Sequence, residues 1–143
     1  MPIKVYYAAP MLGDRRNLED NKIIVNMLET RGLQILTKHV VEDILDVDKG
    51  VKPEDIFTRD LRLLDKADIL IADVSYPSLG VGFEIAYALL KGKNVYALCR
   101  KERLPRTSAL IRGISWSNFH LITYNDPKDA VKTLLEKMGE MDG

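Results

Sequence analysis

The sequence is poor in the residues that build covalent or metal cross-links. It contains one cysteine and two histidines among 143 residues. A single cysteine excludes an intrachain disulfide, and these few residues show no metal-ligand spacing. Cys99 lies in an apolar run, where we expect a small core side chain. We therefore expect no metal site.

Long apolar runs and a surplus of either charge are also absent. No segment approaches the roughly 20 apolar residues that span a bilayer, and the N-terminus reads into a strand rather than a signal peptide. The 21 basic and 21 acidic residues cancel, so nothing attracts the whole chain to a nucleic-acid polymer or a membrane. A local basic pocket for a small anion remains compatible with this balance. We expect a cytoplasmic protein.

The length and the hydrophobic pattern favour one domain over residues 1–143. Apolar runs alternate with segments of helical spacing. The expected strands are 3–9, 33–37, 69–74, 94–99 and 119–123. The expected helices are 14–31, 52–67, 83–91 and 126–138, while 107–113 is compatible with a short helix and 39–51 with a loop containing one helical turn.

This alternation predicts an α/β fold of the doubly wound, flavodoxin or Rossmann-like type. The strands are continuous apolar runs, as expected for a five-stranded parallel sheet that is covered by helices on both faces. Such a sheet has a crevice at the carboxyl ends of its strands, where the strand order reverses. We expect the loops at 8–14, 37–48, 75–82 and 99–108 to surround this crevice.

A glycine-rich turn at 75–84 leads from the third strand into a helix. Gly80 and Gly82 allow close approach of backbone to a ligand, and free N–H groups at a helix start favour anions. The turn matches neither a Walker A loop nor a G-x-G-x-x-G fingerprint. Spacing alone leaves phosphate or sugar binding and a plain strand-to-helix turn both open.

Two acidic residues suggest chemistry. Glu84 is expected in the first helical turn, where it either complements the helix dipole or stays ionised as a nucleophile. Asp60 shares a helical stripe with Phe57 and Leu64, so it either holds a proton in a buried site or pairs with a neighbouring arginine. One ionised and one protonated carboxyl can break a glycosidic bond.

Four further side chains have two readings each, and a fifth has one. Tyr6 is a core aromatic or a phenol that bonds a carboxylate, and His39 is a surface or core histidine or a contact for a base. Arg15 and Arg16 are solvated, or they reach a phosphate. Asp73 is most simply a loop cap at the end of its strand.

Together these residues resemble the 2′-deoxynucleoside 5′-phosphate N-hydrolases of the nucleoside 2-deoxyribosyltransferase superfamily. The resemblance extends from the first strand to about Gly113 and is densest where Asp60-Leu61 and Ala67-Asp68 precede P-S-L-G-V-G-F-E at 77–84. Shorter matching pieces are T-K-H-V at 37–40 and S-A-L-I-R-G at 108–113.

The resemblance implies a role for each catalytic residue. Glu84 is similar to a nucleophile that attacks C1′ and forms a deoxyribosyl ester. Asp60 resembles the residue that protonates the departing base and then activates water, while Tyr6 resembles the group that positions Glu84. This chemistry implies no cofactor.

The resemblance also implies how a deoxynucleotide is bound. Ser78 is similar to a phosphate ligand, and His39 would lie near the base. Ser108 resembles a serine that reaches the phosphate in a partner subunit, which implies a homodimer. The family's first loop has the form G-S-I-R-G-G, whereas this chain has A-P-M-L-G-D at 9–14. Pro10 removes a backbone donor, so we hypothesise that Arg15 or Arg16 replaces the missing arginine.

Three other functions compete with this one. A deoxyribosyltransferase would pass the sugar to a second base, but that group usually carries an asparagine near its C-terminus, and residues 136–143 contain none. A phosphoribohydrolase would use P-G-G-x-G-T-x-x-E, whose spacing differs. A nucleotide-binding module without turnover is the third alternative.

Overall fold

Five parallel strands form one sheet in the order β2-β1-β3-β4-β5. The computed structural model describes residues 2–142, with side chains placed through residue 139. The strands are β1 (Lys4–Ala8), β2 (Gln34–Ile35), β3 (Ile69–Asp73), β4 (Asn94–Arg100) and β5 (Phe119–Tyr124). The predicted α/β fold with a five-stranded parallel sheet is confirmed.

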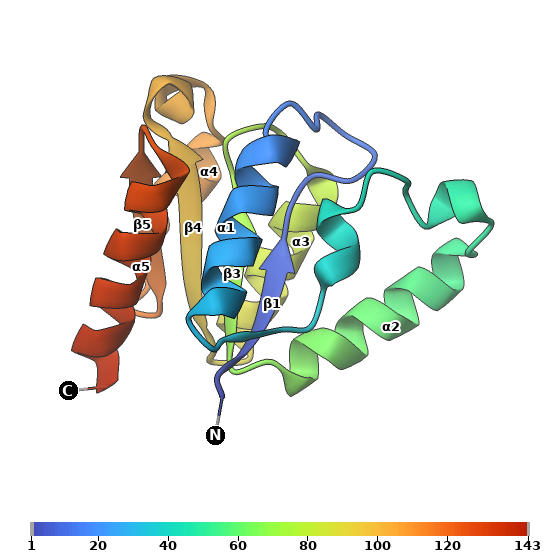
Figure 1. Ribbon diagram of the computed structural model, residues 1–143, viewed down its shortest axis with the longest axis horizontal. Coiled ribbons are helices and arrows are strands. Elements are labelled where there is room, and N and C mark those ends of the chain that lie inside the picture. The colour runs from blue at the N-terminus through green and yellow to red at the C-terminus, as the bar shows by residue number, and fades with distance from the viewer. Residues whose placement is uncertain (1, 143) are drawn as a thin grey trace.

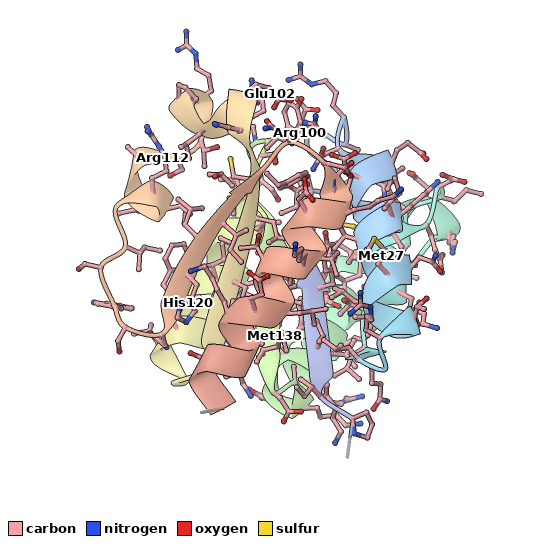
Figure 2. The ribbon with its side chains drawn as sticks, turned by 60° about the vertical axis from the view of Figure 1, so that its left-hand side comes forward. Met27, Arg100, Glu102, Arg112, His120 and Met138 are labelled. Atoms are coloured by element: carbon pink, nitrogen blue, oxygen red, sulfur yellow. The ribbon has the colours of Figure 1, made fainter. Side chains whose placement is uncertain are left out.

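Helices cover both faces of the sheet (Figure 1). One face packs against α1 (Leu18–Thr30) and α5 (Pro127–Asp142), and the other against α2 (Pro53–Lys66) and α3 (Leu79–Leu90). Figure 2 shows Met27 and Met138 at the first of these faces. Side chains alternate along β1, so Tyr7 joins the α1 and α5 side while Tyr6 joins the α2 and α3 side.

Two elements are shorter than the sequence predicts. The α1 helix begins at Leu18 rather than at residue 14, because the Asp14 carboxylate accepts hydrogen bonds from the Arg16 backbone and side chain and holds a turn there. The β2 strand ends at Ile35 because the Thr37 hydroxyl replaces backbone pairing. Its Oγ1 accepts from Tyr7 N at 2.8 Å and donates to Tyr7 O at 2.7 Å.

The segments between strands contain short helical turns. Residues 39–51, expected as a loop, include η1 (Lys38–Val41) and η2 (Val47–Lys49). After β4 come η3 (Lys101–Arg106) and the predicted short helix, α4 (Ala109–Arg112). Within residues 2–142 no helix is both long and apolar enough to cross a bilayer. The end of the 136–143 segment, used above against a transferase, lies outside the described residues.

Candidate active site

A cleft of about 1540 Å³ opens beside the carboxyl ends of β1 and β3. These strands are neighbours, and the helices that follow them lie on opposite faces of the sheet. The loops that leave the two strands therefore diverge, and a crevice opens between them. Segments 9–13, 39–47, 53–61, 73–89 and 106–116 contribute its lining residues. The cleft therefore lies where the sequence predicts a crevice.

Glu84 lies in this cleft, one turn further into its helix than predicted. The α3 helix begins at Leu79, because the Ser78 hydroxyl caps it by accepting from Val81 N at 3.2 Å. The pKa of Glu84 is raised to about 7, chiefly by burial; a hydrogen bond from Tyr6 opposes this rise, and the Asp60 charge adds to it. The expectation that a helix start keeps Glu84 fully ionised at neutral pH is therefore wrong.

Tyr6 reaches Glu84 from the middle of β1. Its hydroxyl donates a hydrogen bond to Glu84 Oε2. Burial, followed by the Glu84 charge, raises the pKa of Tyr6 far above the usual range for a phenol. Tyr6 therefore stays protonated and remains a donor toward the carboxylate.

Asp60 lines the same cleft from α2. Its side chain is 22% exposed, and Oδ1 accepts from Arg59 Nε at 3.0 Å. The expected stripe does not face the core along its whole length, since Phe57 is 55% exposed while Leu64 is fully buried. Asp60 is therefore not deeply buried and pairs with Arg59, as in the second of its two predicted readings. Asp60 and Glu84 nevertheless line the same cleft.

His39 also lines the cleft, in contact with Arg59. Arg59 Nη2 lies 3.0 Å from His39 Nε2, and Arg59 Nη1 donates to Asp46 Oδ2 at 2.7 Å. His39 Nε2 is 3.7 Å from Asp60 Oδ1. Burial, followed by the Arg59 charge, lowers the pKa of His39, so this ring is neutral at neutral pH.

The glycine-rich turn leaves room for a ligand. A Cβ at Gly82 would meet no heavy atom within 4 Å, and one at Gly80 would meet only Ser78 Oγ at 3.9 Å. Packing within the chain therefore requires glycine at neither position. Both glycines and Ser78 line the cleft.

Two residues that follow β4 add polar groups to the lining of the cleft. Ser108 caps α4, with Oγ accepting from Ile111 N at 3.3 Å, and it lines the cleft of its own chain. The exposed Arg106 also lines the cleft. These groups and Ser78 are available to bind an anion.

The two arginines proposed to replace the family's loop arginine are both paired within the chain. Arg15 donates to the carbonyls of Val40, Glu42 and Asp43, at 3.1, 2.8 and 3.3 Å, and is not among the lining residues. Its proposed reach to phosphate is contradicted, because the guanidinium holds the end of η1. Arg16 is exposed and paired with Asp14, as in the solvated alternative.

Sequence reasoning missed three cleft residues that the fold brings in. The sequence indicates Arg59 only as a neighbouring arginine that could pair with Asp60, and this adjacency is the one local signal for its place in the cleft. Tyr76 lines the cleft, with the guanidinium carbons of Arg16 and Arg103 each 4.4 Å from its ring centroid. Nothing in the sequence around Arg106 indicates that it lines the cleft, because its position depends on the path of residues 100–108.

Asp73 behaves as the predicted loop cap. Its Oδ1 accepts from Ser75 N at 3.0 Å, and Oδ2 accepts from Asn21 Nδ2 at 2.9 Å. Burial raises the pKa of Asp73. The residue anchors the end of β3 beneath the cleft.

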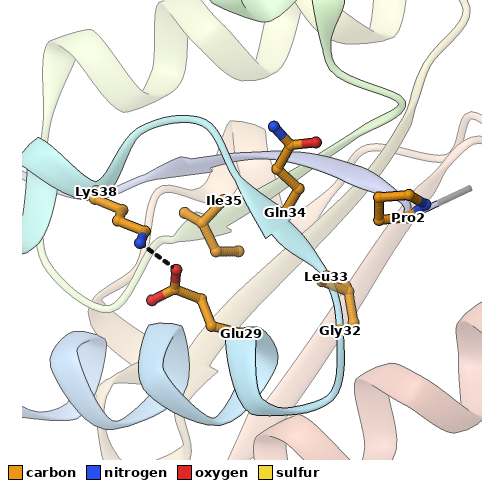
Figure 3. A pocket seen from close by; sticks show the side chains of 7 residues that line it. All are labelled: Pro2, Glu29, Gly32, Leu33, Gln34, Ile35 and Lys38. Atoms are coloured by element: carbon orange, nitrogen blue, oxygen red, sulfur yellow. Dashed lines mark ion pairs between the residues drawn. The ribbon is translucent and has the colours of Figure 1, made fainter.

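A second hollow, of about 460 Å³, lies at the β2 edge of the sheet. It contains none of the predicted site residues, and Lys38 Nζ pairs with Glu29 Oε2 at 2.6 Å within it (Figure 3). Among residues 2–142 no three His, Cys, Asp or Glu side chains are grouped to hold a metal ion. Instead, the lining of the larger cleft includes Tyr6, Asp60, Glu84, Ser78 and Ser108.

Known proteins resemble this chain over most of its length. A protein of Thermofilum pendens, named "Putative 2′-deoxynucleoside 5′-phosphate N-hydrolase 1", is 58% identical over 132 residues and covers 92% of each chain. The 5-hydroxymethyl-dUMP N-hydrolase of Danio rerio is 33% identical and covers 96% of each chain. The solved CMP N-glycosidase of Clostridium botulinum has a TM-score of 0.67 at 24% identity, covering 92% of this chain and 97% of that one, which shows a shared fold.

The resemblance seen in the sequence is confirmed by these matches. The model of the family described as nucleoside 2-deoxyribosyltransferase matches residues 5–131, a range that contains every predicted site residue. With this match and relatives at up to 58% identity, the chain belongs to the nucleoside 2-deoxyribosyltransferase family.

Proposed function

We propose that this protein is an N-glycosidase that hydrolyses 2′-deoxynucleoside 5′-monophosphates to a free base and 2-deoxyribose 5-phosphate. The observation that carries the proposal is the meeting of Glu84, its donor Tyr6 and Asp60 in one cleft. The names of the Thermofilum pendens and Danio rerio relatives, both N-hydrolases, support the reaction class.

In the first step the Glu84 carboxylate attacks C1′ as the bond to the base breaks. Asp60 gives its proton to the departing base, and a deoxyribosyl ester of Glu84 remains. A pKa of about 7 leaves a large fraction of Glu84 ionised at neutral pH. The transition state resembles an oxocarbenium ion, so the carboxylate stabilises the developing charge.

In the second step water hydrolyses the ester. Asp60, now ionised, accepts a proton from water as the oxygen bonds to C1′ and Glu84 departs as a carboxylate. Asp60 regains its proton and Glu84 its charge, so the cycle closes without a cofactor. Tyr6 donates to Glu84 Oε2, which favours the ionised form both before attack and on departure.

The phosphate supplies binding energy remote from the reacting carbon. Ser78, Ser108 and Arg106 offer two hydroxyls and a guanidinium in the cleft, and the first turn of α3 adds backbone N–H groups. Guanidinium groups suit phosphate because their donors match its oxygens. Binding the phosphate to these groups would hold C1′ against Glu84.

We further propose a homodimer. Large apolar side chains surround the cleft, more exposed than a monomer's surface favours. Among them Leu79 is 98% exposed, Leu110 82%, Leu12 73% and Trp116 54%. A second copy covering this surface would exclude water from the cleft and bring its own Ser108 close to the neighbouring site.

A panel of nucleotides tests the activity. Purified protein is incubated with dAMP, dGMP, dCMP and dTMP, with 5-hydroxymethyl-dUMP, and with the ribonucleotides AMP and CMP, and free base is measured by chromatography. We expect release from deoxynucleotides, no release by Glu84→Gln, and a mass increase on Glu84 of rapidly quenched enzyme. Release from ribonucleotides alone, or binding without release, would refute the proposal.

A deoxyribosyltransferase is the second candidate, favoured by the description of the matching family. It is tested by adding a labelled free base to a deoxynucleoside or its monophosphate. Exchange of the base without net release of sugar phosphate would identify a transferase. We expect hydrolysis that the added base does not divert.

A further inference from the structure

The Arg59 guanidinium contacts three polar side chains of the cleft at once. It donates to Asp60 Oδ1 from Nε at 3.0 Å and to Asp46 Oδ2 from Nη1 at 2.7 Å, and its Nη2 lies 3.0 Å from His39 Nε2. The three contacts use different nitrogens, so the planar fork is fixed in one orientation. Arg59 and its three neighbours all line the cleft.

The contact with His39 determines which ring nitrogen carries the proton. Arginine has no acceptor and keeps its charge, so His39 Nε2 must accept the hydrogen bond. A neutral ring that accepts at Nε2 carries its hydrogen on Nδ1. His39 is therefore the Nδ1–H tautomer.

The contact between Arg59 and Asp60 involves only one of the two carboxylate oxygens of Asp60. Oδ1 accepts from Arg59 and lies 3.7 Å from His39 Nε2. Within residues 2–142, Oδ2 has no hydrogen-bond partner. Oδ2 is therefore the oxygen free to carry the reacting proton.

We propose that Arg59 is a positioning residue: it holds Asp60 by Oδ1 for proton transfer at Oδ2, and it fixes His39 as the neutral Nδ1–H tautomer. The inference rests on the proposed function for the role of Asp60, while the state of His39 is independent of it. Without Arg59 the His39 ring is free to protonate Nε2 and donate to Asp60 Oδ1. Asp60 Oδ1 would then contact a movable histidine ring instead of the fixed guanidinium.

The charges around His39 give a second consequence. Arg59 lowers the pKa of His39, although less than burial does, whereas Asp60, Asp46 and Glu42 raise it. Removing the Arg59 charge leaves the three carboxylates unopposed. The pKa of His39 is therefore expected to rise in a variant without a cation at this position.

The test compares Arg59→Met with wild type and with Arg62→Met. Arg62 is an exposed arginine on the same helix, and its side chain makes no hydrogen bond or ion pair within residues 2–139. It therefore controls for losing an arginine from α2. The nitrogen-15 spectrum of the histidine rings reports the tautomer directly. The chain has two histidines, and His120→Gln assigns the signals.

We expect His39 as Nδ1–H in wild type and in Arg62→Met, and a shift toward Nε2–H with a raised pKa in Arg59→Met. We also expect kcat for base release to fall about 10- to 100-fold in Arg59→Met with a smaller change in KM, because Asp60 loses its fixed geometry. Arg59→Lys keeps the charge but not the fork, so it is expected to lose kcat as well. The Arg59→Lys variant also provides the test if Arg59→Met does not fold.

Three results would overturn the inference: an Nε2–H ring in wild type, His39 spectra unchanged by both Arg59 substitutions, or an unchanged kcat in both. A wild type that releases no base would refute the proposed function instead. In that case the His39 spectra still decide whether Arg59 fixes the ring. The two failures are therefore distinguishable.

Discussion

Replacing Tyr6 with phenylalanine removes one hydroxyl from the cleft and little else. This hydroxyl donates to Glu84 Oε2, and it opposes the rise of the Glu84 pKa to about 7 that burial causes. Without this donor the ionised carboxylate is less stable, so the pKa of Glu84 rises further. Because the proposed attack needs ionised Glu84, activity at neutral pH is expected to fall.

The size of the effect follows from the strength of the bond. A hydrogen bond to a charged group contributes about 1.5–3 kcal/mol, which corresponds to roughly one to two pKa units. From a starting pKa of about 7, the ionised fraction at pH 7 falls from about one half to between roughly one tenth and one hundredth. We therefore expect kcat/KM at pH 7 to decrease about 5- to 50-fold.

The assay is the pH profile of kcat/KM for base release, measured in wild type, Tyr6→Phe and a control. Tyr87→Phe is a matched control, since it removes a hydroxyl from α3 that donates to Asp65 at 2.7 Å and does not line the cleft. The acidic limb is expected to move to higher pH in Tyr6→Phe alone. An unmoved limb would mean that Tyr6 does not tune Glu84.

Four further outcomes are expected. Above pH 7, the unfolding free energy of Glu84→Gln is expected to exceed that of wild type by up to about 3 kcal/mol. The reason is that ionisation of the buried Glu84 destabilises wild type as the pH rises from 4.5 to about 7. Urea unfolding at pH 4.5 and pH 8 measures the difference between the two proteins, and an equal difference at both pH values would contradict the prediction. Arg15→Ala lowers stability by about 1–3 kcal/mol in the same assay and leaves KM for monophosphate unchanged. Arg106→Gln raises that KM about tenfold and spares the free nucleoside; equal effects on both would exclude a phosphate contact. Leu110→Asp yields monomers in light scattering, whereas a dimer in that variant would place the interface elsewhere.

The predictable part of the fold is the part set by local pattern. The apolar runs at β1, β3, β4 and β5 are long enough to identify buried parallel strands, and their order with the helices fixes the crevice. The β2 strand is the exception, since its last pairs are replaced by the Thr37 side chain. A side chain that replaces a backbone hydrogen bond leaves no mark in the hydrophobic pattern, so the sequence predicts a longer strand.

The sequence predicts part of the cleft lining, but not the ionisation of the groups in it. The spacing of Asp60, the glycine-rich turn and Glu84 identifies the site residues, because the motif records them directly. The protonation of Glu84 depends on how tightly the cleft encloses it, which is a tertiary property. Arg15 shows the same limit, because its partners are carbonyls of a segment 25 to 28 residues away.

The two tyrosines of β1 make the alignment of this strand matter for chemistry as well as for packing. Tyr6 bonds Glu84 on one face, and its neighbour Tyr7 bonds Asn21 on the other at 2.7 Å. A slip by one position would exchange two phenols of the same size, so the hydroxyls alone discriminate poorly between the two alignments. The Thr37 hydroxyl bonds both the N–H and the carbonyl of Tyr7, and these two bonds help to fix the register of the strand. A one-residue slip would break both Thr37 hydrogen bonds to Tyr7, and these bonds therefore favour the native alignment.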